Sequence, residues 1–154
     1  MDAFIVQDRG LTYRIEQVEE GGYFGQVVEL PTCITEGLTL DETITNLRDA
    51  LALYIEVAGR RRHRGPCAAE AGRGSGELRL PDLPALKPTE VISALRRAGF
   101  TVRRQRGSHA ILANAATGRR TVIPIHSRDL SMRTLREVIV QAGLTVEEFL
   151  ALLR

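Results

Sequence analysis

The segment 103–112, RRQRGSHAIL, places a histidine directly after three arginines and a Gly-Ser pair, at the start of an apolar run. Imidazole can accept and donate protons near neutral pH, and cleavage of RNA through its 2′-hydroxyl requires one proton to be removed and another to be supplied. Arginine presents paired N–H donors that suit phosphate, and glycine allows a ligand to approach the backbone closely. The segment therefore favours acid–base chemistry on a phosphodiester by His109. The simpler alternative is that His109 is only a polar residue entering a strand.

A second histidine, His126, lies in the segment PIHSRDL, just after the third strand expected in this half of the chain. If the second and third strands form a hairpin, His126 leaves the sheet near the end where His109 enters it, and the two imidazoles could divide the roles of acid and base. The alternative is that His126 only caps or positions its loop. The residues expected to contact RNA are Lys87, Arg103, Arg104, Arg106, Gly107, Ser108, Arg119, Arg120 and Arg128. No group of His, Cys, Asp and Glu has metal-ligand spacing, so we expect neither a metal nor another cofactor.

Hydrophobic periodicity predicts the order α-β-β-β-α-α for residues 83–154, with proline in the first helical turn and glycine after the helix ends. The strands are expected at 100–105, 109–114 and 120–125. The helices are expected at 88–98, from about 131 to 142, and directly after a capping box of Thr145 and Glu148. This is the element order of a double-stranded-RNA-binding domain with an added helix.

Residues 1–58 predict the order β-β-β-α. Alternating segments indicate strands at 11–20, 23–30 and 33–37, and Glu20-Gly21-Gly22 is typical of a hairpin turn between the first two. A helix is expected from a capping box of Thr39 and Glu42 to Ala58, where Gly59 ends it.

Residues 59–82, which are rich in glycine and lack apolar periodicity, are expected to form a flexible linker. Charge is distributed unevenly on the two sides of it. Residues 1–58 contain three basic and eleven acidic residues, a net charge of −8, whereas residues 87–154 contain twelve basic and five acidic residues, a net charge of +7. Such asymmetry indicates that the basic half binds a polyanion, that the halves bind each other, or both.

The bulk composition is that of a globular protein, with 44% apolar and 26% charged residues. No apolar run approaches the roughly 18 residues of a membrane span, and the N-terminus does not have the pattern of a signal peptide. The two cysteines form no disulfide or metal motif, which is typical of a reducing compartment. We therefore expect a cytoplasmic protein with no membrane partner.

The stretches LPALKPTEVISALRRAGFTVRRQRGSHAIL and VIPIHSRDLSMRTLREVIVQAGLTVEEFLALL resemble the HicA toxin family of type II toxin–antitoxin systems over nearly all of 83–153. The shared motifs are the Lys-Pro helix start, Ala-Gly-Phe, Gly-Ser-His, Pro-x-His and the Leu-Arg…Gln-Ala-Gly ending. The resemblance implies a double-stranded-RNA-binding-like fold and cleavage of mRNA that arrests translation. It also implies that the histidine of the Gly-Ser-His motif, His109, is the catalytic residue.

The stretch GGYFGQVVELPTCITEGLTLDETITNLRDALALYIE resembles the HicB antitoxin family over roughly 12–58, through Gly-Gly-Tyr, Leu-Pro-x-Cys and Gly-x-Thr-Leu-x-Glu. The resemblance implies a partial RNase H-like fold that lacks the nuclease carboxylates and covers the toxin. HicB proteins usually continue into a DNA-binding domain, whereas this sequence continues into the predicted linker. Binding of operator DNA is therefore not expected.

These features together predict a single-chain toxin–antitoxin protein. Residues 83–154 would form a metal-independent mRNA endoribonuclease that uses His109, and the acidic domain 1–58 would hold it inactive. The expected partner is mRNA. The contact between antitoxin and toxin could form within one chain or be exchanged between two chains, and the second case would give a homo-oligomer.

Two other function classes fit part of the sequence. The first is a non-catalytic RNA-binding module that the N-terminal domain regulates, in which His109 only shapes the loop; such a module would show steep salt dependence and no cleavage products. The second is a DNA-binding repressor working through the basic segment 59–65, which is disfavoured because no recognition helix is apparent.

Overall fold

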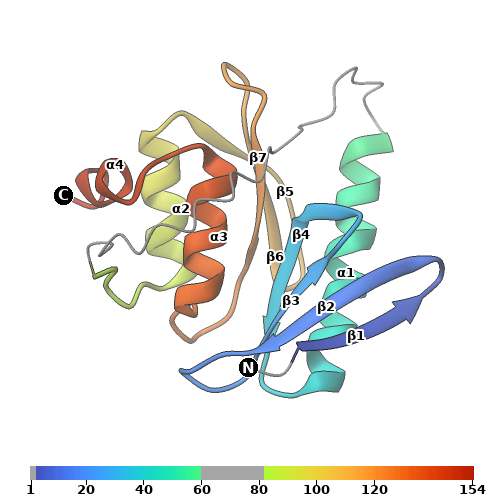
Figure 1. Ribbon diagram of the computed structural model, residues 1–154. Helices are drawn as coiled ribbons and strands as arrows, with labels where there is room; N and C mark the ends of the chain where they lie inside the picture. Colours follow the sequence, from blue (N-terminus) through green and yellow to red (C-terminus); the bar gives the residue numbers. More distant parts are fainter. Residues whose placement is uncertain (1–2, 60–81) are drawn as a thin grey trace.

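The chain forms two antiparallel sheets and four helices in the part that the computed structural model describes, residues 3–59 and 82–154 (Figure 1). The N-terminal half has the order β1 (Ala3–Asp8), β2 (Leu11–Gln17), β3 (Tyr23–Val27), β4 (Leu30–Gly37) and α1 (Leu40–Gly59). The C-terminal half has the order α2 (Pro88–Arg97), β5 (Phe100–Arg106), β6 (His109–Asn114), β7 (Arg120–Pro124), α3 (Met132–Ala142) and α4 (Val146–Ala151). The α+β class and the order α-β-β-β-α-α are confirmed. The predicted linker 59–82 lies almost entirely outside the described residues.

Strand β1 is an element that the sequence did not predict, so the N-terminal half has four strands before its helix instead of three. A two-residue turn joins β1 to β2, and both of its residues have positive φ, 51° at Arg9 and 80° at Gly10. Such turns usually contain Asn-Gly or Asp-Gly, because few other residues accept positive φ. An arginine at the first turn position is not a turn signal, so the hairpin was missed.

The helix boundaries follow the capping residues that the sequence indicated. The Thr39 hydroxyl accepts a hydrogen bond from the Glu42 N–H at 3.1 Å, and the Glu42 carboxylate accepts from the Leu38 N–H at 2.6 Å, one residue earlier than in a standard capping box. Helix α3 begins after Ser131, whose hydroxyl accepts from the Thr134 N–H, and ends at Gly143 with φ of 73°. The left-handed conformation at that end explains the glycine.

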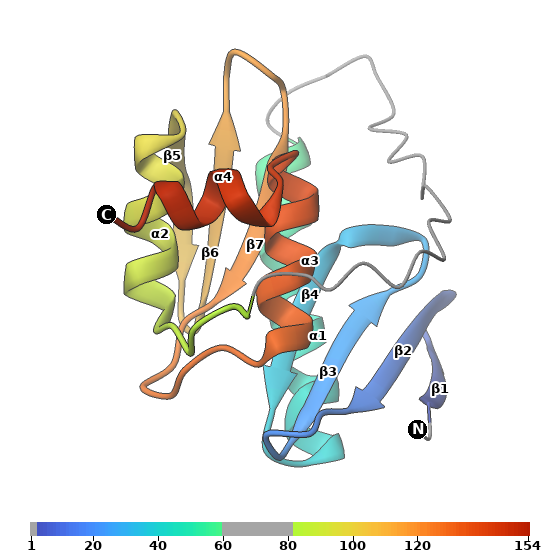
Figure 2. The same cartoon turned by 60° about the vertical axis from the view of Figure 1, so that its left-hand side comes forward.

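The two sheets lie beside each other through β4 and β7, between α1 on one side and helices α2 and α3 on the other (Figures 1 and 2). Each sheet therefore contacts a helix of the other half. Helix α1 packs on β3 and β4 and also on β5 and β6, and helix α3 packs on β7 and also on β4.

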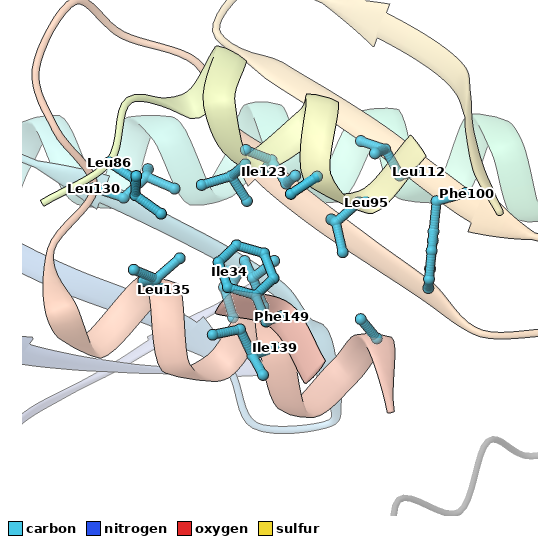
Figure 3. Packing of buried hydrophobic residues seen from close by; sticks show 14 of the residues in the cluster. Ile34, Leu86, Leu95, Phe100, Leu112, Ile123, Leu130, Leu135, Ile139 and Phe149 are labelled. Carbon is cyan, nitrogen blue, oxygen red and sulfur yellow. The ribbon is translucent and has the colours of Figure 1, made fainter. Parts of the chain in front are cut away.

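The apolar core is shared between the halves. Phe24 and Ile34 of the N-terminal half are buried in the cluster formed mainly by the C-terminal helices and strands. Figure 3 shows Ile34 among the residues of this cluster. Conversely, Ile111 and Val122 of the C-terminal sheet are buried in the cluster around α1. Because burying one such side chain contributes about 1.5–3 kcal/mol, the two halves stabilise each other.

We predict that Ile111→Ala lowers the free energy of unfolding of the whole chain by about 2–5 kcal/mol, because Ile111 is 1% exposed and its truncation leaves a cavity between the sheet and α1. Urea unfolding followed by circular dichroism measures this change. Val140→Ala on the solvent side of α3, where the side chain is 63% exposed, is the control and should change the free energy by less than about 0.5 kcal/mol. Equal effects of the two substitutions would contradict a shared core.

Candidate active site

His109 is the first residue of β6 and follows a tight turn formed by Gly107 and Ser108. Gly107 has φ of 56°, a conformation that glycine adopts without strain, and the space beside its Cα is open. Because successive residues of a strand point to opposite faces, His109 shares a face with Ile111, which packs against α1. The candidate site therefore lies on the face of the C-terminal sheet that α1 covers.

The imidazole of His109 is 1% exposed and hydrogen-bonds to the N-terminal half. Its Nε2 lies 2.8 Å from the Thr35 hydroxyl on β4, and its Nδ1 lies 3.4 Å from the Ser108 hydroxyl. Burial lowers the pKa of His109 to about 4; the Asp49 carboxylate opposes this shift and the nearby His126 adds to it. The ring is therefore neutral at pH 7, the form in which it can accept a proton.

The covering half, and not the core of its own half, buries His109. The neighbours Ala110 and Leu112 face the opposite side of the strand, in the cluster with α2 and α3. The His109 ring faces Thr35 and α1. It is thus neither packed inside the C-terminal half nor open to solvent.

His126 lies two residues beyond β7, at the end of the sheet where His109 enters it, because His109 pairs with Pro124. Its Nε2 lies 2.8 Å from the Glu36 carboxylate and its Nδ1 lies 2.9 Å from the Arg128 carbonyl oxygen. Each ring nitrogen thus lies within hydrogen-bond distance of an oxygen atom of another residue.

Glu36, the residue after Thr35 on β4, is a buried acid that is 7% exposed. Its carboxylate also accepts from the Ser131 N–H at 2.7 Å, at the start of α3. Burial alone would raise the pKa of Glu36, but hydrogen bonds from His126, Ser131 and Thr134 outweigh burial and lower it. The side chain is therefore an anion in the interior.

Two of the predicted arginines lie close to His109 on the face of the sheet that carries it. A bulge in β5 after Val102 places Arg104 and Arg106 on that face and leaves Arg103 exposed at the irregular position. The carboxylate of Glu56 on α1 lies 2.6 Å from the Arg104 guanidinium and 3.9 Å from that of Arg106. An acidic side chain of the covering helix thus pairs with cations beside the histidine.

The other residues predicted to contact RNA lie further apart. Arg120 pairs with Ala113, on the same face but toward the far end of β6. The Arg119 side chain packs against Gly143, at the C-terminal end of α3. Lys87 precedes α2, and Arg128 lies in the loop after His126.

The site residues that the sequence interpretation missed all come from the N-terminal half: Thr35, Glu36 and Glu56. The segment CITEG was predicted as a strand, but its polar side chains were not predicted to face the other half. The glutamate within this predicted strand was the available signal, because a buried carboxylate requires partners.

Neither a metal site nor a membrane span is apparent in the described parts of the chain. Within residues 3–59 and 82–154, His, Cys, Asp and Glu form no group of three or more that could hold a metal ion. Over the same ranges, no helix is both long and apolar enough to cross a membrane.

Cys33 is buried, and burial raises the pKa of its thiol to about 12.

Comparison with known proteins shows a family resemblance for part of the C-terminal half. Residues 88–144, which include His109 and His126, match the family described as HicA toxin of bacterial toxin-antitoxin. The chain is also similar to a UPF0150 protein of Synechocystis sp., with 40% identity over 42 residues, which are 27% of this chain and 61% of that protein. A UPF0150 protein of Archaeoglobus fulgidus is 42% identical over 43 residues, which are 28% of this chain and 62% of that protein. The chain thus spans about three fifths of the length of these curated relatives, and the resemblance of residues 88–144 to HicA toxins, predicted from their motifs, is confirmed.

Proposed function

We propose that the protein is a single-chain toxin–antitoxin system: an mRNA endoribonuclease in the C-terminal half, held inactive by a HicB-like N-terminal half. The match of residues 88–144 to HicA toxins supports the nuclease part. The observation that carries the inhibitory part is the 2.8 Å hydrogen bond between the Thr35 hydroxyl of one half and His109 Nε2 of the other.

In this proposal the Thr35 hydroxyl stands in for the ribose 2′-hydroxyl of RNA. Neutral His109 accepts the proton of that 2′-hydroxyl as its oxygen attacks the adjacent phosphorus. The bond from phosphorus to the 5′-oxygen breaks, which leaves a 2′,3′-cyclic phosphate, and the departing oxygen takes a proton from the imidazolium or from water. Arg104 and Arg106 lie on the same face, where they can contact the phosphate.

In this proposal the N-terminal half inhibits the nuclease by covering the sheet face that carries His109. Helix α1 packs on the sheet face that RNA would need, and Glu56 pairs with the two arginines. A covalent tether raises the local concentration of the covering half to the order of millimolar, so a modest intrinsic affinity is sufficient to keep the site closed.

We predict that residues 83–154 expressed alone arrest growth and deplete mRNA, and that the intact chain does neither. The variant His109→Gln of residues 83–154 should lose both effects, because it removes the proton acceptor and keeps a polar side chain of similar size. Growth curves and primer extension on cellular mRNA measure the two effects.

Soluble expression and circular dichroism of the two fragments serve as the control for folding. Full cleavage by the His109→Gln fragment would remove His109 from the mechanism. RNA binding without cleavage products from the unmodified fragment would favour the non-catalytic RNA-binding module instead.

We predict that the halves stay together after the chain is cut at a protease site introduced between residues 60 and 81. The ion pairs between the halves are weakened by salt, because the Debye length falls from about 10 Å at 0.1 M to about 3 Å at 1 M. The shared apolar core is not weakened in this way. Size-exclusion chromatography at both salt concentrations should show co-elution, and separation of the halves at either one would contradict inhibition by docking.

We predict that the intact chain loses stability as the pH falls from 6.5 to about 4. The unfolded chain binds a proton at His109 near pH 6.5, whereas folded His109 stays neutral down to about pH 4. The resulting loss in the free energy of unfolding is about 3 kcal/mol once the pH has fallen to the folded pKa. The lowered pKa of Glu36 removes further stability only below its unfolded value of 4.5. Urea unfolding across this range should show a shallower decline for His109→Gln, and identical declines would contradict a buried neutral imidazole.

A further inference from the structure

Carboxylates of the N-terminal half occupy hydrogen-bond donors at the start of α3. The Ser131 N–H donates to Glu36 at 2.7 Å, and the Met132 N–H donates to Glu20 at 2.9 Å. His126 Nε2 lies 2.8 Å from the second Glu36 oxygen. The C-terminal half thus supplies every one of these donors, and the N-terminal half supplies both anions.

Glu36 is a bound anion in this arrangement, and not merely a neighbour of a helix end. It is 7% exposed, and burying an ionised carboxylate without donors would be strongly unfavourable. The hydrogen bonds nevertheless keep its pKa below the ordinary value. The positive end of the α3 dipole acts in the same direction. The pocket therefore stabilises an anionic pair of oxygens in the interior.

The pocket adjoins the candidate catalytic histidine. Thr35 forms a hydrogen bond with His109, and the next residue, Glu36, forms one with His126. The Ile125 N–H also donates to the Ser108 carbonyl at 2.6 Å, which holds the segment before His126 against the residue before His109. A cavity of about 270 Å³ borders the pocket and is lined by Glu36, Arg128, Ser131 and Met132, among others.

We propose that His126 and the backbone N–H groups of Ser131 and Met132 form a phosphodiester-binding subsite of the C-terminal half, which Glu36 and Glu20 occupy in the closed chain. A phosphodiester presents two anionic oxygens, as a carboxylate does, and helix N-termini bind phosphate through the same donors. The identity of the ligand rests on the proposed function: if the C-terminal half cleaves RNA, the subsite binds an RNA phosphate next to the one that is cleaved. His126 is then a binding residue and not a second acid or base.

The test removes the occupying carboxylate from the full chain and offers phosphate in its place. In Glu36→Ala, inorganic phosphate and dimethyl phosphate, a phosphodiester, should each raise the melting temperature more than they raise that of the parent chain. In NMR spectra of the same titrations, the amide signals of Ser131 and Met132 should shift. The double variant Glu36→Ala/His126→Gln should bind dimethyl phosphate about tenfold more weakly, because one charge-assisted hydrogen bond is lost.

Glu29→Ala is the matched control. The Glu29 carboxylate also accepts hydrogen bonds from a backbone N–H, that of Thr12 at 2.9 and 3.1 Å, but this contact lies within the N-terminal half. Phosphate should not stabilise this variant beyond the parent chain. If Glu36→Ala does not fold, Glu20→Ala provides a narrower test: it frees only the Met132 N–H, whose amide signal should then respond to dimethyl phosphate.

Equal stabilisation of Glu36→Ala and Glu29→Ala by dimethyl phosphate would overturn the subsite, as would unshifted amide signals of Ser131 and Met132. Binding of inorganic phosphate alone would overturn its assignment to a phosphodiester. None of these readouts depends on RNA cleavage. A positive titration together with a C-terminal fragment that folds but does not cleave RNA would therefore refute the proposed nuclease and leave the anion subsite standing.

Discussion

The arrangement depends on one constraint: the C-terminal sheet is apolar on both faces, but its own helices cover only one of them. Ala110, Leu112 and Ile123 face α2 and α3, whereas Ile111 and Val122 face the other way. A sheet face of this kind must be buried against another layer. Helix α1 provides that layer, and α3 in turn packs on the sheet of the N-terminal half. Apolar docking, more than the opposite charge of the halves, sets their relative positions.

The apolar contacts between the halves fix where the polar side chains of β4 meet the C-terminal half. Thr35 and Glu36 are consecutive residues of β4, so their side chains point to opposite faces of the strand. One reaches His109 on the α1 side, and the other reaches His126 and the start of α3. Each is buried and each has a partner, which avoids the cost of an unsatisfied polar group. A single strand segment of the N-terminal half thus engages both histidines at this end of the sheet.

Much of this fold could be predicted from the sequence, because capping residues and alternation are local signals. Thr39, Ser131 and Gly143 mark helix ends by chemistry that acts within one turn. The Gly-Ser-His segment likewise pointed to His109. The hairpin at Arg9 was missed because its turn uses an uncommon residue. Thr35 and Glu36 were missed for a different reason: their role arises only from contact with residues more than 70 positions away. Charge asymmetry indicated that the halves meet, but it could not specify which side chains touch.

The shared core also bears on how His109 could become accessible to RNA. Strand β4 packs closely on α1, since a methyl group at the Cα of Gly37 would lie 2.7 Å from the Thr43 nitrogen, and we therefore expect the two elements to move together. Moving β4 and α1 together would expose Ile111 and Val122 to water, at about 1.5–3 kcal/mol for each side chain. A local opening would therefore leave the apolar contacts in place and the histidine covered. We expect RNA to reach His109 only after the whole N-terminal half is lost or unfolded. Access then depends on how long that half stays folded and present, and not on the strength of any one ion pair.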